Sequence, residues 1–109
     1  MPNAIIDKHG NKCWFVNGVR HRDDGPAIEW ADGAKSWYKN GKRHRDDGPA
    51  IENANGTKKW FVNGYRHRTN GPAVKYAHGG KEWWLNNKIY IEDEFIMMQF
   101  LKGIIIIDD

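Results

Sequence analysis

A motif of 23 residues recurs along this chain and constrains its fold more than any other feature. Tryptophans stand 23 residues apart, at Trp14, Trp37, Trp60 and Trp83, and we call the repeats around them units one to four. Each tryptophan is followed by an aromatic residue. In units one to three an Asn-Gly pair, a His-Arg pair and a Gly-Pro-Ala triplet then follow in the same order. A period between 20 and 50 residues is typical of arrays whose neighbouring units stack on one another.

Unit two illustrates the local structure that we expect of each repeat. Short β-prone segments at 27–30, 34–39 and 42–45 alternate with turn sequences. Asn40-Gly41 favours a type I′ hairpin turn, because both residues tolerate a positive φ. The Asp-Asp-Gly-Pro stretch at 46–49 ends the pairing, since proline has no N–H and aspartate favours turns. The pattern predicts a mainly β fold, a meandering antiparallel sheet of stacked β-hairpins with about seven or eight strands.

The repeats predict a single domain over residues 1–109, with four 23-residue hairpin repeats at 5–90, the first and last partial. Residues 91–109 predict a C-terminal cap. Three acids at its start suit a helix N-terminus and Lys102-Gly103 is a stop signal, so we expect a helix over 92–102. We expect a short strand, buried on both faces, at Ile104–Ile107. The helix is apolar on more than one side, which predicts a homodimer contact. Its candidate residues are Phe95, Met97, Met98, Phe100, Leu101 and Ile105.

Two rows of aromatic side chains are expected on the sheet, because side chains alternate between the faces of a strand. An open sheet normally has one apolar and one polar face, so two aromatic faces require two coverings. We expect the tryptophan row to pack between units, with lysine stems lying over it. The second row is the candidate surface for a protein partner, since an uncovered aromatic patch tends to mark an interaction site. It comprises Phe15, Tyr38, Phe61 and Trp84.

Charge is unevenly distributed along the chain. The net charge is +3, but residues 50–90 carry 7 basic and 2 acidic side chains, net +5, and 91–109 carry 1 basic and 5 acidic, net −4. A basic middle favours an anionic partner, although a solvated surface is the simpler alternative. Arginine contacts and a stacking ring would hold a small anion such as a nucleotide or a cyclic nucleotide. The candidate residues are Lys58, Lys59, Tyr65, Arg66, Arg68 and Lys75.

Long nucleic acids and membranes are not expected partners. Equivalent arginines recur every two strands, about 9.5 Å apart, which is a longer step than the phosphate spacing of an extended nucleic acid strand. The longest aliphatic run, Ile104–Ile107, is too short to span a bilayer. The N-terminus lacks the apolar segment of a signal peptide, and the single cysteine allows no internal disulfide. We therefore expect a cytoplasmic location.

No catalytic or metal centre is predicted. His21, His44 and His67 match a zinc set in number, but a spacing of about 9.5 Å keeps equivalent residues of successive units from sharing one ion. We expect each imidazole to bond a backbone group or an aspartate at its turn. The His-Arg-Asp-Asp sequence at 21–24 and 44–47 occurs twice, whereas a catalytic site is usually single. Its aspartates are expected to cap turns and neutralise the neighbouring arginines, and no enzyme activity or cofactor is predicted.

The unit W-[FY]-x-N-G-x-x-H-R-D-D-G-P-A resembles the MORN repeat, and more closely the MORN-like repeats of tailed phages and giant viruses. The resemblance covers residues 5–90 and rests on the 23-residue length, the aromatic before the turn, the turn glycine and the following histidine. It implies stacked β-hairpins in an elongated single-layer sheet, and MORN proteins are associated with membrane lipids and protein assembly. The chain departs from the family at Arg22, Arg45 and Arg68, where the usual repeat has glycine after the histidine.

The sequence thus predicts a non-enzymatic protein-interaction module. The viral resemblance implies a phage-encoded accessory protein in the host cytoplasm that binds and inhibits a host factor, such as a component of a defence system. Two alternatives remain open. One is a binder of a small anionic ligand at unit three, and the other is a structural or assembly module without a ligand.

Overall fold

The structure is a computed structural model that describes residues 3–106. One set of strands is β1 (Ile5–Ile6), β2 (Lys12–Cys13), β5 (Ile28–Glu29), β6 (Lys35–Ser36), β9 (Ile51–Glu52), β10 (Lys58–Lys59), β13 (Val74–Lys75), β14 (Lys81–Leu85) and β15 (Lys88–Tyr90). A second set is β3 (Phe15–Val16), β4 (Val19–Arg20), β7 (Tyr38–Lys39), β8 (Lys42–Arg43), β11 (Phe61–Val62) and β12 (Tyr65–Arg66). The helix α1 (Glu92–Leu101) follows the last strand.

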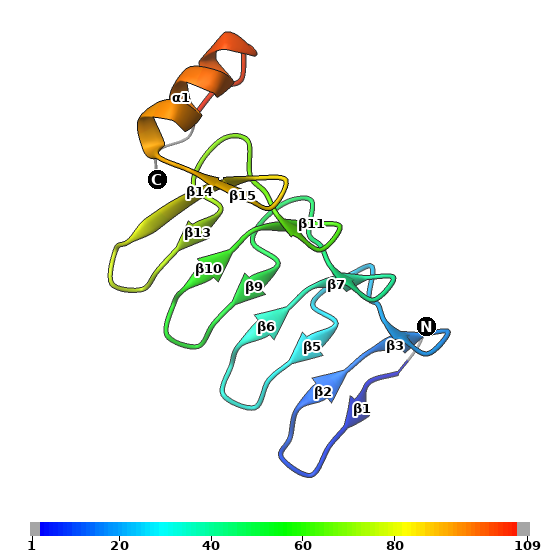
Figure 1. Cartoon of the computed structure of the whole chain (residues 1–109). Helices are drawn as coiled ribbons and strands as arrows, with labels where there is room; N and C mark the ends of the chain where they lie inside the picture. The colour runs from blue at the N-terminus through cyan, green and yellow to red at the C-terminus, as the bar shows by residue number, and fades with distance from the viewer. Residues whose placement is uncertain (1–2, 107–109) are drawn as a thin grey trace.

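The units follow one another in an elongated array that measures 47 × 29 × 19 Å (Figure 1). Within residues 3–106, the first set of strands forms one nine-stranded antiparallel sheet, in the order β1-β2-β5-β6-β9-β10-β13-β14-β15. The pairs β3-β4, β7-β8 and β11-β12 form three separate two-stranded hairpins beside it. The expected mainly β fold, a meandering sheet of hairpin repeats followed by a helix, is confirmed.

Each of units one to three bends sharply at its tryptophan, which the sequence did not predict. We expected one strand over 34–39, but β6 ends before Trp37 and β7 begins after it. The backbone N–H of Trp37 donates to the carbonyl oxygen of Ala50 at 2.7 Å, and Trp14 and Trp60 repeat this bond. The accepting alanines are fully buried. The chain therefore leaves the long sheet at the tryptophan and enters a separate hairpin. The unbroken strand expected over 34–39 is wrong, and over the described residues the long sheet has nine strands where seven or eight were expected.

The hairpin tips have the predicted turn chemistry. Asn40 and Gly41 both have positive φ, 51° and 81°, as a type I′ turn requires. In unit four the tip is Asn86-Asn87, with φ of 48° and 69°. The tips of units two to four also bond the preceding hairpin. The backbone N–H of Gly41 donates to the carbonyl oxygen of Arg20 at 2.8 Å, and Gly64 and Asn87 make the equivalent bonds.

One face of the long sheet is buried and the other is charged. Cross-strand register places Ile28 beside Ser36, and Lys59 beside Val74, on the buried face. Ile28 and Val74 are at most 2% exposed, and Ser36 is 7% exposed. The residues next along each strand form the charged face.

The C-terminal helix lies at the end of the array. Figure 1 shows α1 beyond β14 and β15. It packs against β14, its Phe95 is fully buried, and the Gln99 amide donates to the carbonyl oxygen of Thr69 at 3.0 Å. The helix predicted at 92–102 is therefore confirmed to within one residue. The strand expected at 104–107 is wrong over 104–106, where the chain forms no strand and Ile105 is 82% exposed, and residue 107 lies outside the described residues.

An arginine closes each of units one to three over its tryptophan. The Arg45 guanidinium carbon lies 3.8 Å from the centroid of a Trp37 ring. Nη1 donates to the Pro49 carbonyl at 3.1 Å and to Glu52 at 2.9 Å, and Nε donates to Asp47 at 3.1 Å. Arg22 and Arg68 stack in the same way over Trp14 and Trp60. We call this arrangement the arginine clamp. The clamp confirms that Asp24 and Asp47 neutralise arginines. Lysine stems were expected to lie over the tryptophans, but arginines cover them instead.

The clamp explains the glycine of the Gly-Pro-Ala triplet and gives a stability prediction. A Cβ at Gly48 would lie 3.0 Å from the Arg45 guanidinium carbon. Because that guanidinium is held by several partners, Gly48→Ala should lower the free energy of unfolding by about 1–3 kcal/mol. In an Arg45→Ala background the same change should cost much less, as urea unfolding of the double-mutant cycle would measure. An equal cost in both backgrounds would contradict the clamp.

Candidate functional site

The aromatic row proposed from the sequence as a partner surface is interleaved with arginines. The Arg43 guanidinium carbon lies 5.6 Å from the Phe61 ring centroid, and that of Arg66 lies 5.8 Å from Phe61 and 4.9 Å from Trp84. Phe61 is only 6% exposed. The other members are half-buried: Phe15, Tyr38 and Trp84. The row therefore packs between successive hairpins, and the ring of Phe61 belongs to the core.

The last aromatic of the row is also tied down by its polar atom. The Trp84 indole N–H donates to Glu82 Oε1 at 2.9 Å, and the Tyr76 hydroxyl donates to Glu82 Oε2 at 2.9 Å. The hydrogen bond to Glu82 is the main cause of a raised pKa for Tyr76, because the phenol donates to a carboxylate. Both oxygens of this carboxylate are thus engaged in structure.

The repeated histidines join each unit to the next. His44 Nδ1 accepts the backbone N–H of Asn63 at 3.0 Å, so Nε2 carries the ring proton and faces Asp46 Oδ1 at 2.7 Å. His21 makes the same pair of contacts, at 2.9 Å to Asn40 and 2.8 Å to Asp23. The expectation that each imidazole bonds a backbone group or an aspartate at the turn is confirmed. Among residues 3–106, no group of three or more potential ligands is placed to hold a metal ion.

His67 occupies the third position of this series and, like His21 and His44, is half-buried. Its Nδ1 accepts the backbone N–H of Asn86 at 3.0 Å, and Thr69 stands where the other units have an aspartate. Burial, with a smaller contribution from the positive charge of Lys102, lowers the pKa of His67 below its usual 6.5. Folding therefore favours the neutral form of this imidazole. Its Nδ1 accepts a hydrogen bond from Asn86, which protonation of Nδ1 would break.

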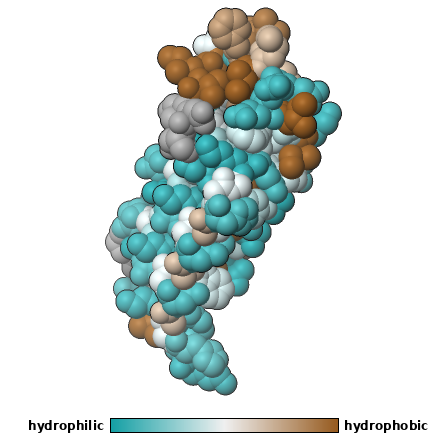
Figure 2. All heavy atoms as spheres, turned by 90° about the vertical axis from the view of Figure 1, so that its left-hand side faces the viewer, coloured by the Kyte–Doolittle hydropathy of each residue, from teal (hydrophilic) through white to brown (hydrophobic). Residues whose placement is uncertain are grey.

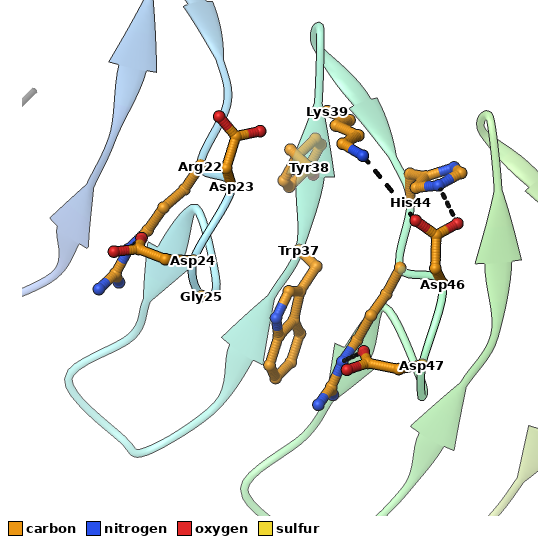
Figure 3. A pocket seen from close by; sticks show the side chains of 11 residues that line it. Arg22, Asp23, Asp24, Gly25, Trp37, Tyr38, Lys39, His44, Asp46 and Asp47 are labelled. Atoms are coloured by element: carbon orange, nitrogen blue, oxygen red, sulfur yellow. Dashed lines mark hydrogen bonds and ion pairs between the residues drawn. The ribbon is translucent and has the colours of Figure 1, made fainter. Parts of the chain in front are cut away.

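Grooves open between successive units in the described part of the chain. The first, of about 580 Å³, lies between units one and two and is lined by Arg22, Asp23, Asp24, Gly25, Trp37, Tyr38, Lys39, His44, Arg45, Asp46 and Asp47. Figure 3 shows several of its charged groups paired with one another, as where Lys39 Nζ lies 3.8 Å from Asp46. The second, of about 540 Å³, lies between units two and three, and Thr69 and Asn70 replace the aspartates on one wall. Neither set of lining residues includes a serine or cysteine nucleophile.

The charged face of the long sheet carries one row of directly opposed side chains. In strand order the row reads Lys12, Glu29, Lys35, Glu52, Lys58, Lys75 and Lys81. Opposite charges thus alternate as far as Lys58, and two further lysines, Lys75 and Lys81, follow it on the next two strands. Sequence reasoning missed Lys81, because only the register of β13 with β14 places it beside Lys75.

The structure divides the anion-binding set that the sequence suggested. Lys58 and Lys75 face each other across β10 and β13. Lys59 lies on the other face of the sheet, where its cross-strand partner is Val74. Arg66 belongs to the aromatic row and Tyr65, 55% exposed, to the separate β11-β12 hairpin. Arg68 forms the clamp of unit three.

Exposed apolar side chains gather at the helical end of the molecule (Figure 2). Phe100 and Leu101 are 73% and 76% exposed. We call the following set the C-terminal apolar surface: Ile91, Met97, Phe100, Leu101 and Ile105. Four of the six expected dimer contacts are thus exposed or half-exposed on α1 or just after it, and Met98 is half-buried. Phe95 is wrong as a contact, because it is fully buried against the array.

Comparisons with known proteins returned no match, whether to protein-family models, curated proteins or solved structures. The resemblance to MORN-like repeats therefore remains a prediction from the sequence. No helix in the described part of the chain has both the length and the apolar composition that crossing a membrane requires.

The lowered pKa of His67 predicts a pH-dependent stability. Below about pH 6.5 the His67 side chain takes up a proton more readily in the unfolded chain than in the folded chain. The free energy of unfolding therefore decreases as the pH is lowered, by at most about 1.4 kcal/mol per pH unit from this residue. His67→Gln should flatten the dependence of melting temperature on pH between about 7.5 and 5. His9→Gln, at an exposed site, is the control and should keep the wild-type slope. An unchanged slope in the His67 variant would refute the assignment.

Proposed function

We propose that this chain is a non-enzymatic protein-interaction module that binds through the C-terminal apolar surface. The exposure of Phe100, Leu101 and Ile105, between 73% and 82%, carries the proposal. The terminal element of a repeat array normally presents a polar outer face, because it has no neighbour to cover it. Large exposed apolar side chains at such an end favour a protein partner.

The first partner we propose is a second copy of the chain. The first turn of α1 is acidic, with Glu92, Asp93 and Glu94, and the last turn has no basic residue, but Lys102 follows directly. Two copies of α1 packed antiparallel would bring Lys102 of each chain toward the acidic turn of the other. Such a contact is self-complementary, as a two-fold dimer interface must be. It would cover the apolar residues of both chains at once.

A host factor is the second partner we propose, from the resemblance to MORN-like viral repeats. In that setting the chain is a phage-encoded accessory protein that inhibits a host protein, such as part of a defence system. The aromatic row is a weaker candidate for this contact than it was from sequence, because arginines and neighbouring hairpins cover much of it. The apolar helix surface would then serve both partners in turn.

The absence of enzyme activity stays part of the proposal and has its own support. The histidine-aspartate pairs of units one and two are engaged at the turns, where Nδ1 binds the next hairpin. A general base needs a nitrogen free to take a proton from a substrate. The repeated groups are thus committed to holding the array together.

The dimer proposal predicts a monomeric variant. Phe100→Glu/Leu101→Glu should dissociate the dimer, because burying two new carboxylates in an apolar contact is costly. Sedimentation velocity over about a hundredfold range of concentration would measure the mass of each form. Tyr65→Glu, at a 55% exposed site on β12, is the matched control and should stay dimeric. A wild-type chain that is monomeric throughout would refute self-association.

A further inference from the structure

The separate hairpins of units one to three carry three arginines that take no part in the clamp. They stand directly before the histidine of each unit, at Arg20, Arg43 and Arg66, and we call them the arginine row. Strand register pairs each of them with an aromatic residue of its own hairpin: Phe15, Tyr38 and Phe61. Directly opposed residues lie on the same face, so the arginines and the aromatic residues share one face of the hairpins.

Backbone hydrogen bonds hold the arginine row at a regular spacing. The carbonyl oxygen of each row arginine accepts a backbone N–H from the tip of the next hairpin, at 2.8 Å for Arg20 and Arg43 and 2.9 Å for Arg66. Figure 1 shows β3, β7 and β11 following one another along one side of the array. Because each hairpin advances with its unit, equivalent arginines are separated by two strand spacings, about 9.5 Å.

No carboxylate of the described chain pairs with the arginine row. The ion pairs within residues 3–106 involve Arg22, Arg45, the turn histidines and Lys39, and none involves a row arginine. The hairpin segments 15–20, 38–43 and 61–66 contain five basic residues and no acidic one. The buried Nε of Arg66 also has no hydrogen-bond acceptor among the described residues. The guanidinium groups of the row are therefore open to an acidic partner.

The aromatic residues of the next hairpins hold these guanidinium groups in place. The guanidinium carbon of Arg20 lies 5.6 Å from the Tyr38 ring centroid, and that of Arg43 lies 5.6 Å from the Phe61 centroid. Arg20 and Arg43 are nevertheless exposed. An arginine that already lies over an aromatic ring loses less conformational freedom when its planar fork binds a carboxylate. The row thus combines exposed charge with a fixed position.

We propose that the arginine row binds an acidic peptide segment of a partner protein in the polyproline II conformation, with a carboxylate at every third residue. A polyproline II helix has three residues per turn and rises about 3.1 Å per residue, so every third side chain points the same way about 9.3 Å further on. This step matches the spacing of the arginines, about 9.5 Å. Each carboxylate would accept two hydrogen bonds from one guanidinium.

The spacing favours this conformation over other linear anions. In a β-strand the side chains of one face recur about every 6.7 Å, which is too short a step for the row. The phosphates of a nucleic acid strand are also more closely spaced than the arginines. The proposed segment therefore meets all three arginines in register. Its site is separate from the C-terminal apolar surface and does not depend on the oligomeric state.

Fluorescence anisotropy with a labelled peptide of repeated Glu-Pro-Pro triplets, titrated with the full chain, tests the site. The prolines hold the peptide in the polyproline II conformation. A block peptide of the same composition, with all its glutamates at one end, has the same charge without the spacing. We expect the block peptide to bind about tenfold more weakly, because it meets fewer arginines at once. An oligothymidylate of similar charge should also bind more weakly than the triplet peptide.

Arg43→Gln should weaken binding of the triplet peptide by about tenfold, since it removes the central two-pronged contact. Arg43→Lys should restore only part of the affinity, because lysine keeps the charge without the planar fork. Lys42→Gln is the matched control: it removes the same charge from an exposed residue of β8 whose side chain lies on the other face. It should change the affinity by less than about twofold, because a distant exposed charge is screened.

Thermal melting checks that each variant is folded, and Arg20→Gln is the second row variant if Arg43→Gln is not. Phe100→Glu/Leu101→Glu should bind the triplet peptide as the wild type does, which separates this site from the proposed dimer. A wild-type chain that does not bind the triplet peptide, or that binds the block peptide equally well, would overturn the proposal. Equal losses in the Lys42 and row variants, or tighter binding of the oligothymidylate, would overturn it as well.

Discussion

The arginine clamp is the interaction on which the rest of the array depends. In unit two the guanidinium of Arg45 stacks on Trp37 and donates to the carbonyl of Pro49, which lies in the loop that leads to the next strand. Stacking on an aromatic face and a hydrogen bond to a carbonyl each use a different part of the same planar group. One side chain thereby fixes the tryptophan, the loop and the start of the next strand. Gly48 can pass close to this guanidinium because glycine has no side chain. A Cβ there would lie only 3.0 Å from the guanidinium carbon of Arg45.

This dependence explains which parts of the fold could be predicted. Turns were predictable because Asn-Gly pairs and the Gly-Pro-Ala triplet carry local conformational information, and the helix because its ends are marked by charge and glycine. The bend at Trp37 was not, since it arises from a bond between its N–H and Ala50 in the following segment. Alternation of side chains was extrapolated across that bend. The assignment of the two aromatic rows to opposite faces of one strand therefore does not hold in units one to three, whereas β14 runs unbroken through Trp83 and Trp84.

The candidate surfaces were predictable in kind more than in membership. Composition indicated a basic middle and an apolar helix, and both are present. Which residues share a face depends on strand register, which brings Lys81 beside Lys75 and sends Lys59 to the other side. Burial decided the helix surface in the same way, because Phe95 and Phe100 look alike in the sequence but one is core and the other is exposed.

The repeats also indicate where function is to be sought. In units one and two the polar residues of the clamp satisfy one another, as Arg45 does with Asp47 and Glu52. Departures from that pattern remove acids at unit three and are not required by the fold, since Arg68 keeps its stack and its carbonyl bond without them. The three opposed lysines and the C-terminal apolar surface both lie at this divergent end of the array. In its first half the charged side chains mainly bond one another and the turns.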